Sequence, residues 1–272
     1  MTFGYEIEWG NVQKDVTPPS DLAVWEGNGK HCEIDVMNYS EEKGWKASSP
    51  IDPLGGEMNM IPQSSIEELT ENFRILSTEI FPNHVIAPIS HGHAHVRVDW
   101  MQDVEALKEF TLWCDDHYQE IIDECYPTPE LSKDIVSGLR RYFKWDGGAK
   151  FSRPMIEKVK NAKTLEDIIN SDRRGNTTMR NARAFINITG IRNSNTIEFR
   201  CFRMPATVDQ FYDQMKFVEG IMNKKIIKGL NLPKFDPNKL TENPDTIKAL
   251  NEAYSSREER KKLGKKVRLE WE

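Results

Sequence analysis

The sequence contains no long hydrophobic run. None of its stretches approaches the roughly 18 to 20 uninterrupted apolar residues that a membrane-spanning helix requires. The first residues, Met-Thr-Phe-Gly-Tyr-Glu, also lack the character of a signal peptide. We therefore expect no transmembrane segment, no membrane partner and a cytoplasmic location, which for a phage-encoded protein is the host cytoplasm.

Cysteine is scarce and scattered along the chain. The cysteines lack the short paired spacing of a zinc site. A chain of 272 residues can bury a sizeable core without disulfides or a structural metal. We therefore expect reduced thiols at Cys32, Cys114, Cys125 and Cys201.

The chain also has no excess of basic charge. It contains 37 lysines and arginines against 43 aspartates and glutamates, which gives a net charge of −6. A general electrostatic attraction to nucleic acid or to an anionic membrane is therefore not expected, although a local basic patch stays open.

Several catalytic and nucleotide-binding motifs are missing. The sequence has no G-x-S-x-G nucleophile motif and no cysteine in a recognisable catalytic setting. It has neither a G-x-x-x-x-G-K-[ST] phosphate loop nor a G-x-G-x-x-G turn that opens a helix. If the protein uses ATP, a metal ion and strand-borne arginines must therefore hold the phosphates.

Alternation of polar and apolar residues predicts several strands. The segment 11–63 is rich in Gly, Pro, Ser and Asn, and we expect loops and short extended runs there, one of them at 32–37. The alternating patterns occur at residues 3–9, around Glu57, at 85–100, at 184–188 and at 196–204.

Apolar residues at helical spacing predict helices at 66–80, 104–126 and 208–230. A serine just before the first helix can cap it. Residues 130–180 are polar and rich in Lys and Arg, and we interpret them as an insertion over the functional site. Residues 231–272 are highly charged and are expected to form a short helix and a tail.

Glu6 and Glu8 stand two residues apart on the first predicted strand. Side chains at this spacing point to the same side of a sheet, and two close carboxylates repel each other unless a cation lies between them. A magnesium ion would satisfy both. The alternative is a solvated strand face that binds nothing, which is common for half-polar strands.

Glu198 lies in the segment T-I-E-F-R-C-F-R and shares a strand face with Thr196 and Arg200. Placed near the glutamates of the first strand, it would complete an all-oxygen site that suits Mg²⁺ or Mn²⁺ holding nucleotide phosphates. Arg200 would then meet a phosphate. Glu57 follows two glycines in G-G-E-M-N-M, and taken alone it is an ordinary surface glutamate.

The most unusual predicted strand is S-H-G-H-A-H-V-R-V-D-W, which would place all its polar residues on one face if unbroken. Alternate residues on a strand lie roughly 6.5 to 7 Å apart, so two neighbouring histidines can share a zinc ion but three cannot easily do so. The alternative is one histidine in the site and two in structural roles. The arginine and aspartate on this face favour a polar cleft over a dry zinc pocket. The polar residues are His91, His93, His95, Arg97 and Asp99.

A series of motifs resembles a known family. In order, the chain contains G-Y-E-I-E, G-G-E-M-N-M-I-P, H-A-H-V-R-V-D, R-A-F-I-N-I and T-I-E-F-R-C-F-R-M-P. They resemble the amidoligase family, carboxylate–amine ligases related to glutamate–cysteine ligase and glutamine synthetase. The resemblance covers residues 3–230. It implies an α+β fold with an antiparallel, glutamine-synthetase-like sheet, one polar active-site face and helices packed on the other face.

The resemblance also implies a domain organisation and residue roles. Residues 1–230 would form the catalytic domain and 231–272 a charged helix and tail. Arg200 would stabilise the transferred phosphate, and His95 would face the nucleotide or substrate. Asn187 and Arg183 match the R-x-x-x-N strand of the family and would contact the cofactor. The implied metal ligands are Glu6, Glu8, Glu57 and Glu198.

Two departures from the family pattern leave alternatives open. Arg97 stands where the family has its second histidine, yet a shift of the register makes His93 and His95 the H-x-H pair, with His93 a cofactor contact. The Asp-Gly-Ser stretch that many relatives carry before the Glu57 strand has no clear match here.

The implied reaction joins a carboxylate to an amine. The carboxylate attacks the γ-phosphorus of ATP, and the amine then displaces phosphate from the acyl phosphate, while Mg²⁺ or Mn²⁺ neutralises the triphosphate. Arg200 and Arg97 would meet charge on the γ-phosphoryl group, and Asp99 is the candidate base. Lys150 and Arg153, with other basic residues of the insertion, would close over the nucleotide, although a solvated basic loop fits equally well.

Two other classes of function use the same residues. A metal-dependent hydrolase or nuclease could employ this acidic and histidine face, and a binding or assembly protein could keep the fold without activity. The acid and the amine stay open among amino acids, peptides, polyamines and modified nucleotides or DNA. A compact chain of this kind would suit an accessory enzyme of a phage or a bacterium.

Overall fold

The computed structural model describes residues 1–9, 16–25, 56–84, 86, 91–125, 148–171 and 184–233. The predicted run at 32–37, the residue Arg183 and most of the charged segment after residue 230 lie outside these ranges. The same holds for a large part of the expected insertion at 130–180.

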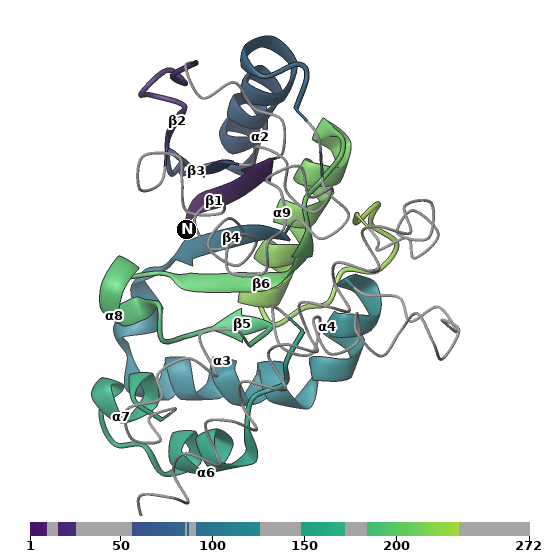
Figure 1. The fold of residues 1–272 in the computed structure, drawn as a ribbon. Coiled ribbons are helices and arrows are strands. Elements are labelled where there is room, and N and C mark those ends of the chain that lie inside the picture. The colour runs from purple at the N-terminus through teal and green to yellow at the C-terminus, as the bar shows by residue number, and fades with distance from the viewer. Residues whose placement is uncertain are drawn as a thin grey trace, which may run out of the picture.

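The strands of the described ranges form one antiparallel sheet in the order β2-β3-β1-β4-β6-β5 (Figure 1). The first strand of the chain thus lies inside the sheet, between β3 and β4. Together with its helices, the sheet confirms the predicted α+β class. The strands are β1 (Thr2–Trp9), β2 (Ala23–Trp25), β3 (Gly56–Met60), β4 (His91–Arg97), β5 (Ile186–Asn187) and β6 (Ile197–Arg203).

Helices connect and cover the strands. None of those in the described ranges combines the length and the apolar composition that a bilayer-spanning segment requires. A π-helical turn, Leu76–Ile80, continues the helix Ile66–Ile75, and a 3₁₀ turn, Asp99–Gln102, precedes the helix Val104–Asp116. The helices are α2 (Ile66–Ile75), α3 (Val104–Asp116), α4 (Tyr118–Cys125), α6 (Arg153–Asn161), α7 (Leu165–Ile169), α8 (Ile191–Ser194) and α9 (Val208–Met222).

Polar residues begin the helices close to where the sequence predicts them. Side-chain oxygens of Ser65, Asp103 and Thr207 accept hydrogen bonds from backbone N–H groups in the first turns of α2, α3 and α9. These caps satisfy donors that have no partner inside a helix.

Two predictions about helix ends were wrong. The expected 104–126 helix is divided at His117, whose ring nitrogen Nδ1 lies 2.9 Å from the carbonyl oxygen of Trp113 and competes for that backbone acceptor. The expected 208–230 helix ends at Met222, after which Lys224 adopts a left-handed backbone conformation with φ of 54°.

One face of the sheet packs against α2 and α9. The ring of Tyr5 meets Phe211 edge-on at 4.8 Å between centroids, and Phe73 stacks on Phe211 at 4.2 Å. Because side chains alternate along a strand, the polar residues of β1 face away from these helices. The buried residues of β1 on the helix-covered face are Phe3, Tyr5, Ile7 and Trp9.

A β-bulge lies between β4 and β6. Gly92 pairs with Phe202 and Ala94 with Phe199, so β6 has one residue more than β4 between these pairs. Gly92 lies over the hydroxyl of Tyr5, where an added Cβ atom would clash with the ring. The absence of a side chain at position 92 therefore lets β4 pass over the core.

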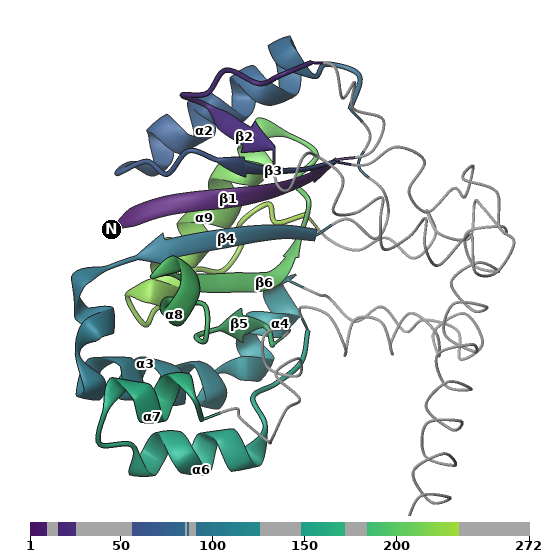
Figure 2. The same ribbon diagram turned by 60° about the vertical axis from the view of Figure 1, so that its left-hand side comes forward.

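The second group of helices lies at the β5 end of the sheet. The sulfur atoms of Cys125 on α4 and Cys201 on β6 lie 3.8 Å apart, and both residues are free thiols in this structure. Helices α6 and α7 pack on α3 and on each other beyond β5 (Figures 1 and 2). The described part of the expected insertion, 148–171, thus lies beside the sheet, and the rest of that segment lies outside the described residues.

Candidate metal centre on the polar face

Strand register brings polar residues together on the face opposite α2 and α9. Glu6 of β1 pairs with His93 of β4, and His95 pairs with Glu198 of β6. Asn187 of β5 pairs with Glu198 from the other side. Residues paired across strands share a face, so these five side chains form one polar cluster.

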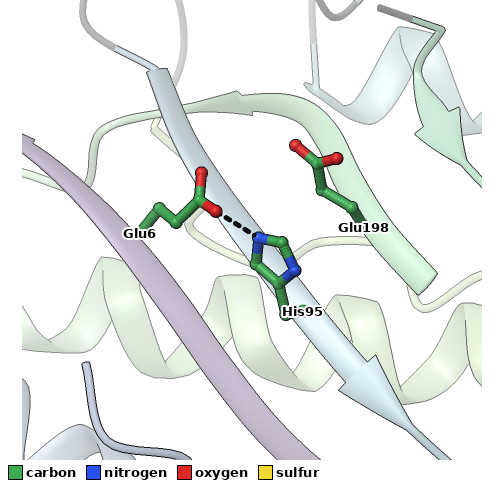
Figure 3. Close-up of side chains that lie close together, drawn as sticks. All are labelled: Glu6, His95 and Glu198. Carbon is green, nitrogen blue, oxygen red and sulfur yellow. Dashed lines mark ion pairs between the residues drawn. The ribbon is translucent and has the colours of Figure 1, made fainter. Parts of the chain in front are cut away.

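Glu6, His95 and Glu198 come close enough to hold one metal ion (Figure 3). One candidate ligand atom from each residue lies within 4.8 Å of those of the other two. The residues come from the adjacent strands β1, β4 and β6, so backbone pairing sets their spacing. Two carboxylates and one imidazole form a donor set that suits Mn²⁺ and also Mg²⁺ or Zn²⁺.

The environment of His95 fits a cation at this place. Its Nδ1 lies 3.1 Å from the hydroxyl oxygen of Thr196, which orients the ring. Its Nε2 lies 2.8 Å from Oε1 of Glu6, but this contact lacks hydrogen-bond geometry, and the buried nitrogen has no hydrogen-bonding partner among the described residues. Nε2 of His95 and Oε1 of Glu6 in this arrangement can both coordinate one metal ion. The donors therefore fit a divalent metal.

His93 of the neighbouring strand β4 holds the carboxylate of Glu6. Its Nδ1 lies 2.7 Å from Oε2 of Glu6 and 3.7 Å from Oε1 of Glu198, and the residue is 4% exposed. Burial and the nearby Arg200 disfavour its charged form, but the hydrogen bond to Glu6 and the charges of Glu8 and Glu198 raise its pKa to about 9. The shift favours the protonated form of His93, which holds the Glu6 carboxylate through their 2.7 Å contact.

Glu6 remains ionised beside these histidines. Burial alone would raise the pKa of its carboxyl group, but the contacts with His93 and His95 hold that pKa well below its usual range. A permanently charged carboxylate is the form that binds a metal ion. Of the two interpretations of the histidine strand, the contacts favour one histidine in the site, His95, with a supporting role for His93, while the side chain of His91 lies outside the described part of the structure.

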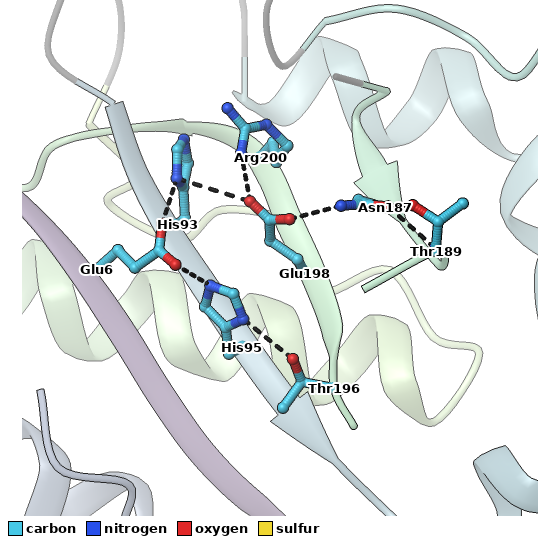
Figure 4. Close-up of polar contacts among 8 residues, drawn as sticks. All are labelled: Glu6, His93, His95, Asn187, Thr189, Thr196, Glu198 and Arg200. Carbon is cyan, nitrogen blue, oxygen red and sulfur yellow. Dashed lines mark hydrogen bonds and ion pairs between the residues drawn. The ribbon is translucent and has the colours of Figure 1, made fainter. Parts of the chain in front are cut away.

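Glu198 is held on both of its oxygens (Figure 4). Nη1 of Arg200 contacts Oε1, and Nδ2 of Asn187 donates a 2.7 Å hydrogen bond to Oε2. The Oδ1 atom of Asn187 in turn accepts hydrogen bonds from the backbone N–H and the hydroxyl of Thr189 at 3.0 and 2.6 Å. Glu198 is only 7% exposed, so these partners compensate for its lost hydration.

The expected set of four glutamate ligands is only partly assembled. Glu6 and Glu198 belong to the cluster, and His95 takes the third place. Glu8 lies on the same face two residues further along β1, and its backbone is paired with that of Glu57 on β3. The side chain of Glu57 lies outside the described part of the structure.

The end of β4 differs from the prediction. The strand stops at Arg97, and Asp99 begins a 3₁₀ turn in which it is exposed. The prediction that Asp99 shares the polar strand face was therefore wrong. Arg97 remains on this face but is exposed, and its guanidinium nitrogens lie 3.2 Å from the side-chain amide of Asn195.

The two described basic residues that were expected to close over a nucleotide lie elsewhere. The Nζ atom of Lys150 lies 3.5 Å from Oδ1 of Asp115 on α3 and 5.5 Å from the ring centroid of Tyr118 on α4. Arg153 is the exposed first residue of α6. Both belong to the helical group beside the sheet.

The role of Thr189 in holding Asn187 was not predicted from the sequence, and neither was the role of His93 in holding Glu6. The segment N-I-T carries a local signal, because an asparagine side chain can accept a hydrogen bond from the backbone N–H two residues later in an Asx turn, here that of Thr189. Comparison of the chain with protein-family models, with curated proteins and with solved structures found no match.

Proposed function

We propose that this protein is an ATP-dependent carboxylate–amine ligase that holds its nucleotide through a divalent cation. The observation that carries the proposal is the cluster of Glu6, His95 and Glu198 on the polar face of an antiparallel sheet. The order of the sequence motifs, which resembles that of amidoligases, adds the reaction class. The chain has no phosphate loop, so a strand-borne metal centre is the means left for binding ATP.

Arg200 supplies positive charge next to the metal ligands. Its guanidinium contacts Glu198, and its side chain keeps 16% of its surface exposed. A guanidinium carries five N–H donors in a planar fork and suits phosphate oxygens. In the proposed reaction Arg200 meets the charge that develops on the transferred phosphoryl group.

In the proposed mechanism a substrate carboxylate attacks the γ-phosphorus of ATP and ADP leaves. An amine then attacks the acyl carbon, phosphate leaves, and the amine loses a proton to a base. Glu6, His95 and Glu198 would hold the cation, which would supply charge neutralisation of the triphosphate. His93 keeps the Glu6 carboxylate in place through their 2.7 Å contact.

The experiment is an assay of ADP release with MnCl₂ or MgCl₂ over pooled carboxylic acids and amines. We expect ADP only when an acid and an amine are both present, and mass spectrometry should find the amide. Glu6→Gln and Glu198→Gln should lose this activity. Glu105→Gln is the matched control, because Glu105 lies on α3 with 78% of its side chain exposed.

Two results would refute the proposal. Metal-dependent cleavage of an ester, peptide or phosphodiester without nucleotide would instead indicate a hydrolase or nuclease at the same residues. The absence of any effect of ATP with Mn²⁺ on the melting temperature would indicate a binding or assembly protein, because a ligand that binds the native state must stabilise it.

A further inference from the structure

Behind Glu198, away from Glu6, two residues form a short hydrogen-bonded chain. Thr189 donates both its backbone N–H and its hydroxyl to Oδ1 of Asn187, and Nδ2 of Asn187 donates to Oε2 of Glu198 (Figure 4). Asn187 is 6% exposed, and it lies on β5 directly across from Glu198 on β6. The chain therefore runs from the β5 edge of the sheet to a candidate metal ligand.

The two donors of Thr189 fix the orientation of the Asn187 amide. A carbonyl oxygen has two lone pairs, and both are occupied here. The reversed amide would place its NH₂ group against the backbone N–H of Thr189 and its oxygen against the Glu198 carboxylate. Both contacts would be repulsive, so only one orientation of the amide is compatible with these neighbours.

This fixed amide in turn sets the position of Glu198. Arg200 holds Oε1 and Asn187 holds Oε2, so the carboxylate is fixed at both ends. Without Asn187, the contact with Arg200 alone would allow the carboxylate plane to rotate. The candidate ligand oxygen of Glu198 would then lose its defined place.

We infer that Asn187 and Thr189 are positioning residues that hold Glu198 for cation binding, and that neither contacts the nucleotide. The inference rests on the proposed metal centre. It differs from the role that the sequence resemblance implies for Asn187, which is contact with the cofactor. The amide oxygen of Asn187 is fully used within the protein, and one N–H of its NH₂ group is used as well.

The test measures Mn²⁺ binding to the full-length protein without nucleotide, by calorimetry and by the electron paramagnetic resonance signal of free Mn²⁺. Residues that orient a metal ligand typically contribute about 10- to 100-fold in affinity, so Asn187→Ala should weaken binding by about 10-fold or more. Thr189→Val removes only the hydroxyl donor and should weaken it by about five-fold, the equivalent of one hydrogen bond. Thr189→Ser keeps a hydroxyl and should bind like the wild type.

Two controls separate positioning from a general structural role. The melting temperature of Thr189→Val without metal should equal that of Thr189→Ser to within a few degrees, because the exchanged groups lie on a partly exposed residue. Glu198→Gln provides the loss expected when the ligand itself is removed. In Asn187→Ala and Thr189→Val, the affinity of the Mn²⁺-loaded protein for an ATP analogue should change less, relative to the wild type, than the affinity for Mn²⁺.

The outcomes are distinguishable. If the wild type does not bind Mn²⁺, or if Glu198→Gln binds it equally well, the proposed metal centre fails and this inference fails with it. If the wild type binds through Glu198 but Thr189→Val and Asn187→Ala retain full Mn²⁺ affinity, only the inference is overturned. Normal Mn²⁺ affinity with weakened ATP binding in Asn187→Ala would assign this residue to the nucleotide instead.

Discussion

Replacing Gly92 by alanine should strongly destabilise the protein. A Cβ atom at this position of β4 would lie 2.5 Å from Cζ of Tyr5, and nearer still to its hydroxyl oxygen. Carbon atoms in favourable contact are roughly 3.5 to 4.0 Å apart. The Tyr5 ring or the β4 backbone must therefore move by about 1 Å or more to remove the overlap.

The surroundings of Tyr5 leave no room for this movement. Its ring is 1% exposed and packs edge-on against Phe211, and its hydroxyl donates a 2.7 Å hydrogen bond to Oε1 of Gln214. Breaking this buried hydrogen bond costs about 1 to 3 kcal/mol, and overpacking a core costs about 1 to 3 kcal/mol. The lower unfolded-state entropy of alanine offsets at most about 1 kcal/mol.

We therefore expect Gly92→Ala to lower the free energy of unfolding by about 1 to 6 kcal/mol, a large part of the roughly 5 to 15 kcal/mol of a typical domain. Urea unfolding followed by tryptophan fluorescence measures this change. Gly4→Ala is the matched control, because its new Cβ would meet only His95 and Pro62 atoms at 3.7 Å. Equal unfolding midpoints for the two variants would refute the reasoning.

Three further changes test other contacts. His93→Leu removes the buried imidazole beside the carboxylate of Glu6 and should lower the unfolding free energy by about 2 kcal/mol. This is less than the roughly 3 to 5 kcal/mol of a fully buried pair, because the Glu6 side chain is 19% exposed. An unchanged urea midpoint would contradict this prediction. Thr207→Ala removes the cap of α9 and should cost about 1 kcal/mol, with Thr207→Ser as the control that keeps the hydroxyl; equal midpoints for the two would argue against the cap. Burial raises the pKa of the thiols of Cys114 and Cys125, so in a Cys32→Ser variant both should resist a thiol reagent until the protein is unfolded, and rapid labelling of the native protein would count against this packing.

Sequence alternation places Glu6 and Glu8 on one face but cannot choose between them. The choice depends on β4, which pairs with β1 so that His93 lies across from Glu6. Register between strands far apart in the chain is set by the packing of the whole sheet, which the pattern of a single strand does not contain. The shared face of Glu6 and Glu8 was therefore predictable, but the contact of Glu6 with His93 was not.

The histidine strand shows the same limit at a finer scale. Its alternation predicts correctly that His93 and His95 share a face, which β4 confirms. Their different roles arise from neighbours on other strands, since His93 contacts Glu6 from a buried position while His95 contacts Thr196 of the segment entering β6. The strand ends before Asp99, where the 3₁₀ turn leads into α3. Nothing in the alternating pattern marks this end.

The charges of the cluster bear on what a cation would add to it. Glu6 is paired with His93, and Glu198 is paired with Arg200, so each candidate carboxylate ligand already has a cationic partner from the protein itself. The cluster is thereby stabilised without a metal ion, unlike small domains whose folding depends on metal binding. Since these partners hold the carboxylates at Oε2 of Glu6 and Oε1 of Glu198, Oε1 of Glu6 is left directed at His95. The protein thus orients its candidate ligand atoms before any cation arrives, and we expect the cluster to keep its geometry when the cation is removed.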